Sequence, residues 1–187
     1  MKISRIIAVT LMACLSLSAA RRSSSAEPPA AIEDGISVYF SPKGGCTAAI
    51  VEQLNAAKQT IDMQAYSFTS TDIAAALAQA HDRGVKVRAV LDRKENETGQ
   101  YTGATYLFNH QVPTWTDGKH PIAHNKIMII DGATIITGSF NFTQQAENSN
   151  AENMLLITGK PALAKAYESN FEEHMGHSDP YHGVEAK

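Results

Sequence analysis

Segments with the pattern of β-strands alternate with segments of helical period along this chain, and that alternation leaves few folds open to it. The strand-like segments are rich in β-branched and apolar residues; they are residues 36–40, 60–66, 85–91, 112–115, 127–130, 134–137 and 152–158. The helix-like segments repeat apolar residues every three or four positions; they are residues 47–58, 71–83, 104–110 and 161–175. We therefore predict an α/β domain with a mixed β-sheet that is flanked by helices on both faces.

Capping and turn residues set several of the element boundaries. Ser70 or Thr71 can cap the second helix, and Gly84 follows that helix where a left-handed residue is needed. Pro161 opens the last helix, at a position that tolerates proline. The polar, glycine-containing residues 92–103 predict a mobile loop.

The beginning of the chain has the order of a secretory signal peptide. Two basic residues precede an apolar run, residues 6–20, and small residues follow up to Ala26. We expect cleavage after Ala26, with residues 18–20 as a second possible site and a lipid-modified Cys14 as a third interpretation. The apolar run is shorter than a comfortable membrane span. The sequence therefore predicts a periplasmic or secreted protein without stable membrane association.

These observations divide the chain into a signal peptide (residues 1–26), a linker (27–35), a catalytic domain (36–175) and a polar C-terminal tail (176–187). Export removes four basic and no acidic side chains, so the net charge of −3 becomes −7. So acidic a domain lacks an extended basic surface, and a polyanion would have to be held by a local positive site.

Cys46 is the only cysteine of the exported chain, so no internal disulfide can form. The thiol could be exposed, or it could link two chains. We take Cys46 instead as a small residue at the start of a helix.

Asp131 and Gly132 separate two apolar runs and predict a hairpin turn. With a two-residue turn, the opposed pairs are Ile130 with Ala133, Lys126 with Thr137, His124 with Ser139, and Ile122 with Asn141. Residues two apart on a strand share a face, so one surface would collect His124, Lys126, Ser139 and Asn141 within the footprint of one phosphate group. A turn one residue longer would move Ser139 and Asn141 to the other face.

Each of these residue types suits phosphoryl transfer. Imidazole is a competent nucleophile near neutral pH, and the ammonium group of lysine is a compact positive charge for phosphate oxygens. The amide of asparagine and the hydroxyl of serine add donors without adding charge. Phosphoryl transfer depends mainly on positioning and charge neutralisation, which such a group of side chains supplies.

The string His124-x-Lys126-x4-Asp131-x6-Gly138-Ser139-x-Asn141 resembles the HKD signature of the phospholipase D superfamily. The segments at residues 65–70 and 149–153 resemble the short bacterial endonuclease branch of that superfamily, and the likeness runs from about residue 36 to about residue 172. The resemblance implies an α/β/α sandwich and a covalent phosphohistidine at His124. It also implies phosphate binding by Lys126, Ser139 and Asn141, a hydrogen bond from Glu152 to the far nitrogen of His124, and no metal or other cofactor.

Other polar residues near the motif need separate interpretations. The first position of a hairpin turn favours aspartate for local backbone bonding, so we assign Asp131 a structural role. His120 could touch the substrate or be an ordinary loop residue. We predict no metal site at His174, His177 and His182, because no acidic or cysteine partners follow them in a tight pattern.

The predicted activity is metal-independent hydrolysis of nucleic acid, by a non-specific endonuclease that acts on DNA or, as a second substrate, RNA. A lipid phosphodiesterase of the phospholipase D type and a catalytically silent nucleic-acid binding module are the alternatives. Longer relatives carry two motifs and this chain carries one, which predicts a homodimer with the active site at the two-fold interface. His120 could instead supply the second imidazole within one chain.

Overall fold

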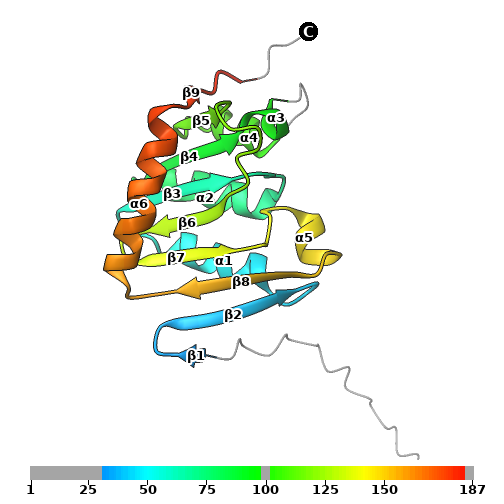
Figure 1. Ribbon diagram of the computed structural model, residues 1–187, viewed down its shortest axis with the longest axis vertical. Helices are drawn as coiled ribbons and strands as arrows, with labels where there is room; N and C mark the ends of the chain where they lie inside the picture. The colour runs from blue at the N-terminus through cyan, green and yellow to red at the C-terminus, as the bar shows by residue number, and fades with distance from the viewer. Residues whose placement is uncertain (1–30, 98–101, 184–187) are drawn as a thin grey trace, which may run out of the picture.

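A mixed β-sheet of nine strands forms the centre of the computed structural model, which describes residues 31–97 and 102–183 (Figure 1). The strand order is β1-β2-β8-β7-β6-β3-β4-β5-β9. Only the pairs β3–β4 and β4–β5 are parallel. The bounds are β1 Ala31–Glu33, β2 Ile36–Ser41, β3 Thr60–Ala65, β4 Lys86–Asp92, β5 Thr114–Asp117, β6 Lys126–Ile130, β7 Thr134–Gly138, β8 Glu152–Ile157 and β9 Asp179–Pro180.

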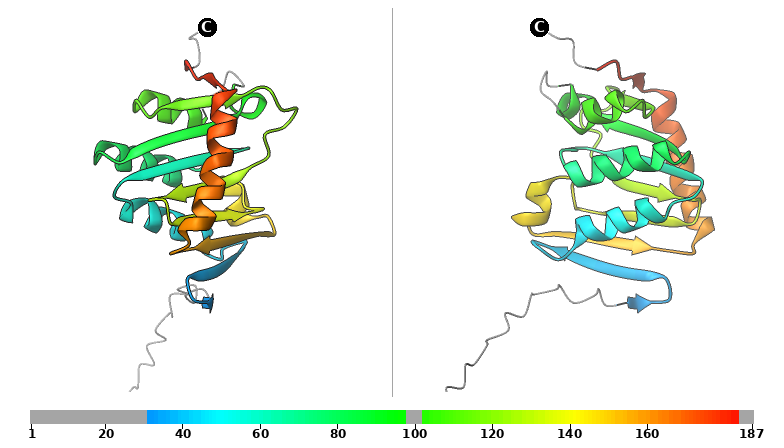
Figure 2. Two further views of the ribbon diagram at one scale, coloured as in Figure 1. Left: turned by 60° about the vertical axis from the view of Figure 1, so that its left-hand side comes forward. Right: turned by 180° about the vertical axis from the view of Figure 1, so that it is seen from behind.

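Helices cover both faces of the sheet, as predicted (Figure 2). The helices are α1 Cys46–Ala56, α2 Thr71–Asp82, α3 Arg93–Asn96, α4 Gly103–Asn109, α5 Gln144–Asn148 and α6 Pro161–Gly176. Helices α1, α2 and α4 pack on one face, and α6 crosses the strands on the other. Neighbouring residues of one strand therefore enter different cores: Met128 packs towards α1 and α2, whereas Ile129 packs with Phe171 of α6. Burial on both faces explains why β6 and β7 are continuous apolar runs in the sequence.

Helix α6 is tied to the sheet by an ionic network as well as by apolar contacts. Arg88 of β4 donates to both carboxylate oxygens of Asp62, at 2.7 and 2.8 Å, and forms an ion pair with Glu172 at 2.8 Å. Its guanidinium also lies 4.8 Å from the ring centroid of Phe171. These contacts hold the C-terminal half of α6 over β3 and β4.

Most predicted elements are present with bounds shifted by one or two residues. Ser70 caps α2 by accepting a hydrogen bond from the Ile73 amide, and Gly84 takes a left-handed φ of 89°. The predicted loop at residues 92–103 instead begins with α3, which Asp92 caps through the Glu95 amide. Helix α5 was not predicted. Both helices are too short to show a helical period.

The two ends of the described chain differ from the predicted linker and tail. Strand β1 lies within the predicted linker and pairs with β2. Strand β9 lies within the predicted tail and pairs with β5, and Tyr181 next to it is buried. The predicted signal peptide lies outside the described residues. Among the residues that are described, no helix is both long enough and apolar enough to cross a membrane.

Cys46 is fully buried at the first position of α1, as expected for a small residue that starts a helix. Burial, and then the negative charge of Glu147, raise the pKa of its thiol to about 12. Such a thiol is neither exposed nor reactive.

The register of the β6–β7 hairpin differs from the predicted one by one residue. The observed pairs are Ile130 with Thr134 and Ile127 with Thr137, so three residues, not two, form the turn. Asp131 and Gly132 take left-handed φ values of 50° and 62°, and Ala133 also stays outside the ladder. The predicted pairings of Lys126 with Thr137 and of His124 with Ser139 are therefore wrong.

Asp131 has a structural role, as we predicted, but its carboxylate accepts hydrogen bonds from a distant segment and not from its own turn. Its carboxylate accepts the backbone amides of Lys58, Gln59 and Thr60 at 2.9, 2.7 and 3.0 Å. Burial alone would raise the pKa of Asp131, but these three amides outweigh it and lower the pKa. The carboxylate therefore fixes the start of β3 against the hairpin turn.

Replacing Asp131 with asparagine is expected to lower the free energy of unfolding by about 1–3 kcal/mol, because hydrogen bonds to a carboxylate are lost. Asparagine tolerates the left-handed backbone as well as aspartate does, so the loss reports the charge and not strain. A group whose pKa is lowered by folding stabilises above its unfolded pKa, so the difference should fade as the pH falls below about 4. Urea titrations at pH 7 and pH 3 measure it, with exposed Glu173→Gln as the control. Equal stability of Asp131→Asn and the wild type at pH 7 would contradict this role.

Candidate active site

Four elements begin or end at one edge of the sheet, on the right in Figure 1, and bring the motif residues to that edge. Strand β3 ends there at Ala65, β6 starts at Lys126, β7 ends at Gly138, and β8 starts at Glu152. The segment after β3 joins the others: the Tyr66 amide donates to the Asn125 carbonyl, and the Thr69 amide donates to the Phe142 carbonyl. The residues around Asn125 and Phe142 therefore flank residues 66–69.

His124, Lys126 and Tyr66 form the centre of this edge. The His124 ring is exposed and lies 4.6 Å, centroid to centroid, from the Tyr66 ring. The ammonium group of Lys126 donates to the His124 carbonyl at 2.8 Å and lies 5.2 Å from the Tyr66 ring centroid. His124 lies before the start of β6. The position of its ring is therefore set by the backbone that leads into the strand, and not by the alternation of side chains along the strand. An accessible imidazole thus lies beside a fixed positive charge.

Lys126 is buried at this edge of the sheet. Only 7% of the residue is exposed. Burial lowers the pKa of Lys126, and the negative charge of Glu152 opposes that effect. A desolvated ammonium group interacts more strongly with a phosphate than a hydrated one does, because little water screens it.

Ser139 and Asn141 follow β7 through a β-bulge, which strand alternation cannot predict. The amides of Ser139 and Phe140 both donate to the Asn153 carbonyl, at 3.1 and 3.3 Å. Gly138 has a φ of 151°, and a Cβ there would lie 2.3 Å from that carbonyl oxygen. Only glycine fits this close approach, which explains the glycine of the motif.

The two side chains beyond the bulge differ in how they are bonded. Ser139 Oγ accepts the backbone and side-chain amides of Asn153 at 3.1 and 3.3 Å. Asn141 Oδ1 is buried and has no hydrogen-bond partner among the described residues. A buried polar atom without a partner is costly, so it marks a place where a bound group or water is expected.

Glu152 affects the site through its charge, but it forms no hydrogen bond with His124. Its Oε1 accepts the side-chain amide of Asn150 at 3.1 Å, and no hydrogen bond joins it to His124 in the described part of the chain. Its charge acts on Lys126. The hydrogen bond that the resemblance implied between Glu152 and His124 is therefore not formed in this structure.

Anchors that we did not predict hold the loop that carries His124. Asp92 Oδ2 accepts the Ala123 amide at 2.8 Å, and Lys94 donates to the Pro121 carbonyl at 3.2 Å. Asp92 and Lys94 lie in the segment that we predicted as a mobile loop. Their position at the C-terminal end of a buried parallel strand, where loops converge, could have indicated this role from the sequence.

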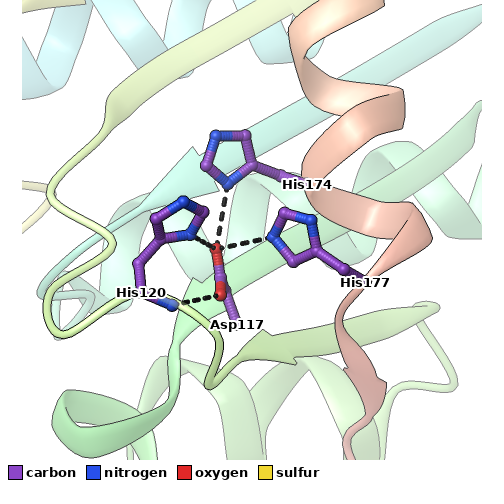
Figure 3. Close-up of side chains that lie close together, drawn as sticks. All are labelled: Asp117, His120, His174 and His177. Atoms are coloured by element: carbon purple, nitrogen blue, oxygen red, sulfur yellow. Dashed lines mark hydrogen bonds and ion pairs between the residues drawn. The ribbon is translucent and has the colours of Figure 1, made fainter.

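His120 belongs to a second group of side chains, shown in Figure 3. Its Nδ1 lies 2.8 Å from Asp117 Oδ2, and His174 and His177 contact the same oxygen. Burial favours a raised pKa for Asp117, but the hydrogen bonds from the three histidines outweigh it and lower the pKa. His182, which we had grouped with His174 and His177, is exposed and lies outside this group. The sequence did not predict this group, because Asp117 and His174 are 57 residues apart.

Comparisons with known proteins agree with this fold and motif. Residues 50–175 match the family described as "Cardiolipin synthase, PLD-like domain". The chain is 41% identical, over 147 residues, to the "Phospholipase D" of Rickettsia prowazekii, and the match covers 79% of this chain and 71% of that protein. The crystal structure of Nuc, a phospholipase D family member from Salmonella typhimurium, is 37% identical with a TM-score of 0.76, covering 79% of this chain and 98% of Nuc. NucT from Helicobacter pylori shares the fold at 21% identity and a TM-score of 0.69, covering 78% of this chain and 98% of NucT.

Proposed function

We propose that this chain, which belongs to the phospholipase D superfamily and is a phosphodiesterase of that superfamily, cleaves nucleic acid. The observation that carries the proposal is an exposed imidazole, His124, beside the buried ammonium group of Lys126. The nucleophile is accessible to a large substrate, and the charge beside it suits a phosphodiester. We assign the phosphate oxygens to the ammonium group of Lys126, the hydroxyl of Ser139 and the side-chain NH2 group of Asn141, all of which can donate a hydrogen bond.

The proposed reaction runs in two steps. A nitrogen of His124 attacks phosphorus, the bond from phosphorus to the leaving oxygen breaks, and an acid protonates that oxygen. Water then attacks the phosphohistidine and gives a proton to the conjugate base of that acid, and the nitrogen–phosphorus bond breaks to release a phosphomonoester and free imidazole. Lys126 neutralises charge on the phosphoryl group in both steps. We place Glu152 as a positioning residue that acts on the site through Lys126.

Two exposed lysines support a polyanionic substrate despite the acidic chain. Lys119 lies on the loop that carries His124, and Lys94 contacts that loop at Pro121. Together with Lys126 they supply local positive charge where a phosphate backbone would enter. Such charges strengthen binding without reading sequence, which fits a non-specific endonuclease on DNA or RNA.

A lipid phosphodiesterase is the second candidate. Its support is the 41% identity to a Rickettsia protein named phospholipase D. Exposed Ile122, two residues before His124, could contact an acyl chain. The two candidates share the nucleophile and the phosphate site, so only the substrate separates them.

Hydrolysis is expected to continue in EDTA, because Lys126 supplies the charge that a metal would supply in a metal-dependent nuclease. Purified protein is incubated with plasmid DNA, RNA or phosphatidylcholine vesicles at low temperature, with EDTA or with magnesium. Lys126→Met, purified in the same way, controls for contaminating nucleases. Nucleic acid cleavage by the wild type alone supports the proposal. Cleavage of the lipid only would establish the second candidate, and activity that EDTA abolishes and magnesium restores would contradict the mechanism.

The proposed enzyme is a homodimer, because its reaction needs a second imidazole to protonate the leaving oxygen. Within one chain His120 was the competing donor. His120 is instead held by Asp117 and packed against His174, with ring centroids 4.9 Å apart. That arrangement supports His124 of a second subunit as the acid. Export to the periplasm or medium remains a prediction from residues 1–26.

A further inference from the structure

Three imidazoles converge on one carboxylate oxygen (Figure 3), where the end of α6 meets β5 at the top of Figure 1. Asp117 ends β5 and His120 follows it on the loop, whereas His174 and His177 lie at the end of α6. Asp117 Oδ2 lies 2.8 Å from His120 Nδ1, 2.9 Å from His174 Nδ1 and 3.2 Å from His177 Nε2. The four ligand atoms all lie within 4.8 Å of one another.

Hydrogen bonds alone explain this arrangement poorly. Each of the three ring nitrogens would have to carry a proton directed at the same oxygen, and the three rings lie only 4.9–5.2 Å apart, centroid to centroid. The Asp117 side chain is fully buried, and only 16% of the His174 and His177 side chains is exposed. A cation at the centre would use all three nitrogen lone pairs and the carboxylate at once.

We propose that Asp117, His120, His174 and His177 bind one divalent transition-metal ion of the Zn²⁺ class. Three imidazole nitrogens and one carboxylate oxygen match the ligands that Zn²⁺ takes in four-coordinate sites. Magnesium and calcium prefer oxygen ligands, so this donor set selects against them. Tetrahedral bonds of about 2.0–2.1 Å put ligand atoms about 3.4 Å apart, so small side-chain rotations would complete the site.

The surroundings of Asp117 prepare it as a ligand. Its Oδ1 accepts the amides of Lys119 and His120, at 2.9 and 3.2 Å, which orients the carboxylate and directs Oδ2 at the histidines. Such outer hydrogen bonds are typical of metal ligands. His174 and His177 lie at the C-terminal end of α6, where the helix dipole favours positive charge.

The site would have a structural role. Four protein ligands close a tetrahedral zinc site and leave no position for a reacting water, so catalysis is not assigned to it. The ion would join the end of α6 to β5 and to the loop that runs on from His120 to His124. Residues 117 and 177 are 60 positions apart, so the cross-link closes a long segment of the chain.

The test uses the full-length exported chain, stripped with EDTA and dialysed, with Zn²⁺ and Co²⁺ as probes. The wild type is expected to bind one Zn²⁺ per chain and to give the visible absorption of four-coordinate Co²⁺. At free Zn²⁺ about 100-fold above Kd, the folding equilibrium shifts about 100-fold, which raises Tm by about 5–10 °C. Hydrolysis at low temperature should not change.

The variants separate this site from adventitious binding. His174→Gln and His177→Gln keep the size of the side chain and a donor for Asp117, and each should weaken Zn²⁺ binding at least about 100-fold. His182→Ala removes an exposed histidine of the same tail and should bind Zn²⁺ as the wild type does. Folded wild type without the Co²⁺ absorption, or equal Zn²⁺ affinity in the wild type and His174→Gln, would overturn the proposal. Because metal uptake and Tm are measured without substrate, failure of the proposed nuclease activity would leave this result unaffected.

Discussion

Replacing His124 with alanine is expected to lower the rate of phosphodiester hydrolysis by about 10⁴–10⁶-fold, which is the scale of losing a covalent nucleophile. The side chain is exposed, so its removal should leave the free energy of unfolding almost unchanged. Initial rates on plasmid DNA and urea titrations measure the two quantities. His182→Ala, another exposed histidine, is the matched control and should keep full activity.

Trapping experiments distinguish a nucleophile from a binding residue. A denaturing quench at alkaline pH, where the nitrogen–phosphorus bond survives, should trap a phosphorylated histidine on the wild type and none on His124→Asn. Lys126→Met keeps the buried volume and should lower kcat by about 10²–10³-fold, as expected for one charge-stabilising group. Lys126 is buried, so the folding of Lys126→Met must be checked. His124 is exposed, so His124→Asn should not disturb the packing of the core. Activity of His124→Ala near that of the wild type would place the nucleophile elsewhere.

The fold could be predicted from sequence because local pattern and global packing agree in it. Strands β6 and β7 are apolar on both faces, Ser70 caps α2 and Pro161 opens α6, so period and boundary signals point to the same elements. The elements that the sequence did not predict are short. Helix α5 has five residues and β9 has two, which is too short for a repeating pattern to show.

The site could be predicted as a set of residues but not as a geometry. The motif identified His124 and Lys126. The prediction of which side chains share a strand face assumed a two-residue turn, whereas the turn has three residues. The hairpin turn at Asp131 was expected; the exclusion of Ala133 from the ladder was not. Sequence spacing carries no information about such a shift, nor about the β-bulge at Ser139, because both depend on contacts with distant segments.

The histidine cluster shows a different limit. His174 and His177 have the spacing of a ligand pair on a helix, but their acidic partner is Asp117, far away in the sequence. Only the packing of α6 across the sheet brings the two halves together. In the sequence, two histidines with this spacing have the same pattern as two solvated side chains on an exposed helix face.

Mixing subunits is expected to show that two chains share one active site. The proposed reaction needs one neutral imidazole to attack and one protonated imidazole to donate, and each chain offers a single His124. A two-fold axis at the site edge would place the two side by side, with the same patch of each chain in contact. If they act as a pair, a heterodimer of wild type and His124→Ala lacks either the nucleophile or the acid. Its activity should fall by at least about 10²-fold, whereas independent sites would retain half.

The interface itself can be changed without touching that pair. Phe40 at the end of β2 and Ile122 before His124 are large apolar side chains that remain exposed, and Phe40 pairs with Asn153 beside the start of β8. Both therefore lie at the edge that carries the site, where a two-fold contact would cover them. Ile122→Asp would place two carboxylates against each other across the axis, so it should produce monomers and lower activity in proportion to the dimer lost. Leu163→Asp changes an exposed residue of α6 and should leave both unchanged. Light scattering at the assay concentration gives the mass, and a fully active monomer would refute the shared site, because a single chain would then hold both the nucleophile and the acid.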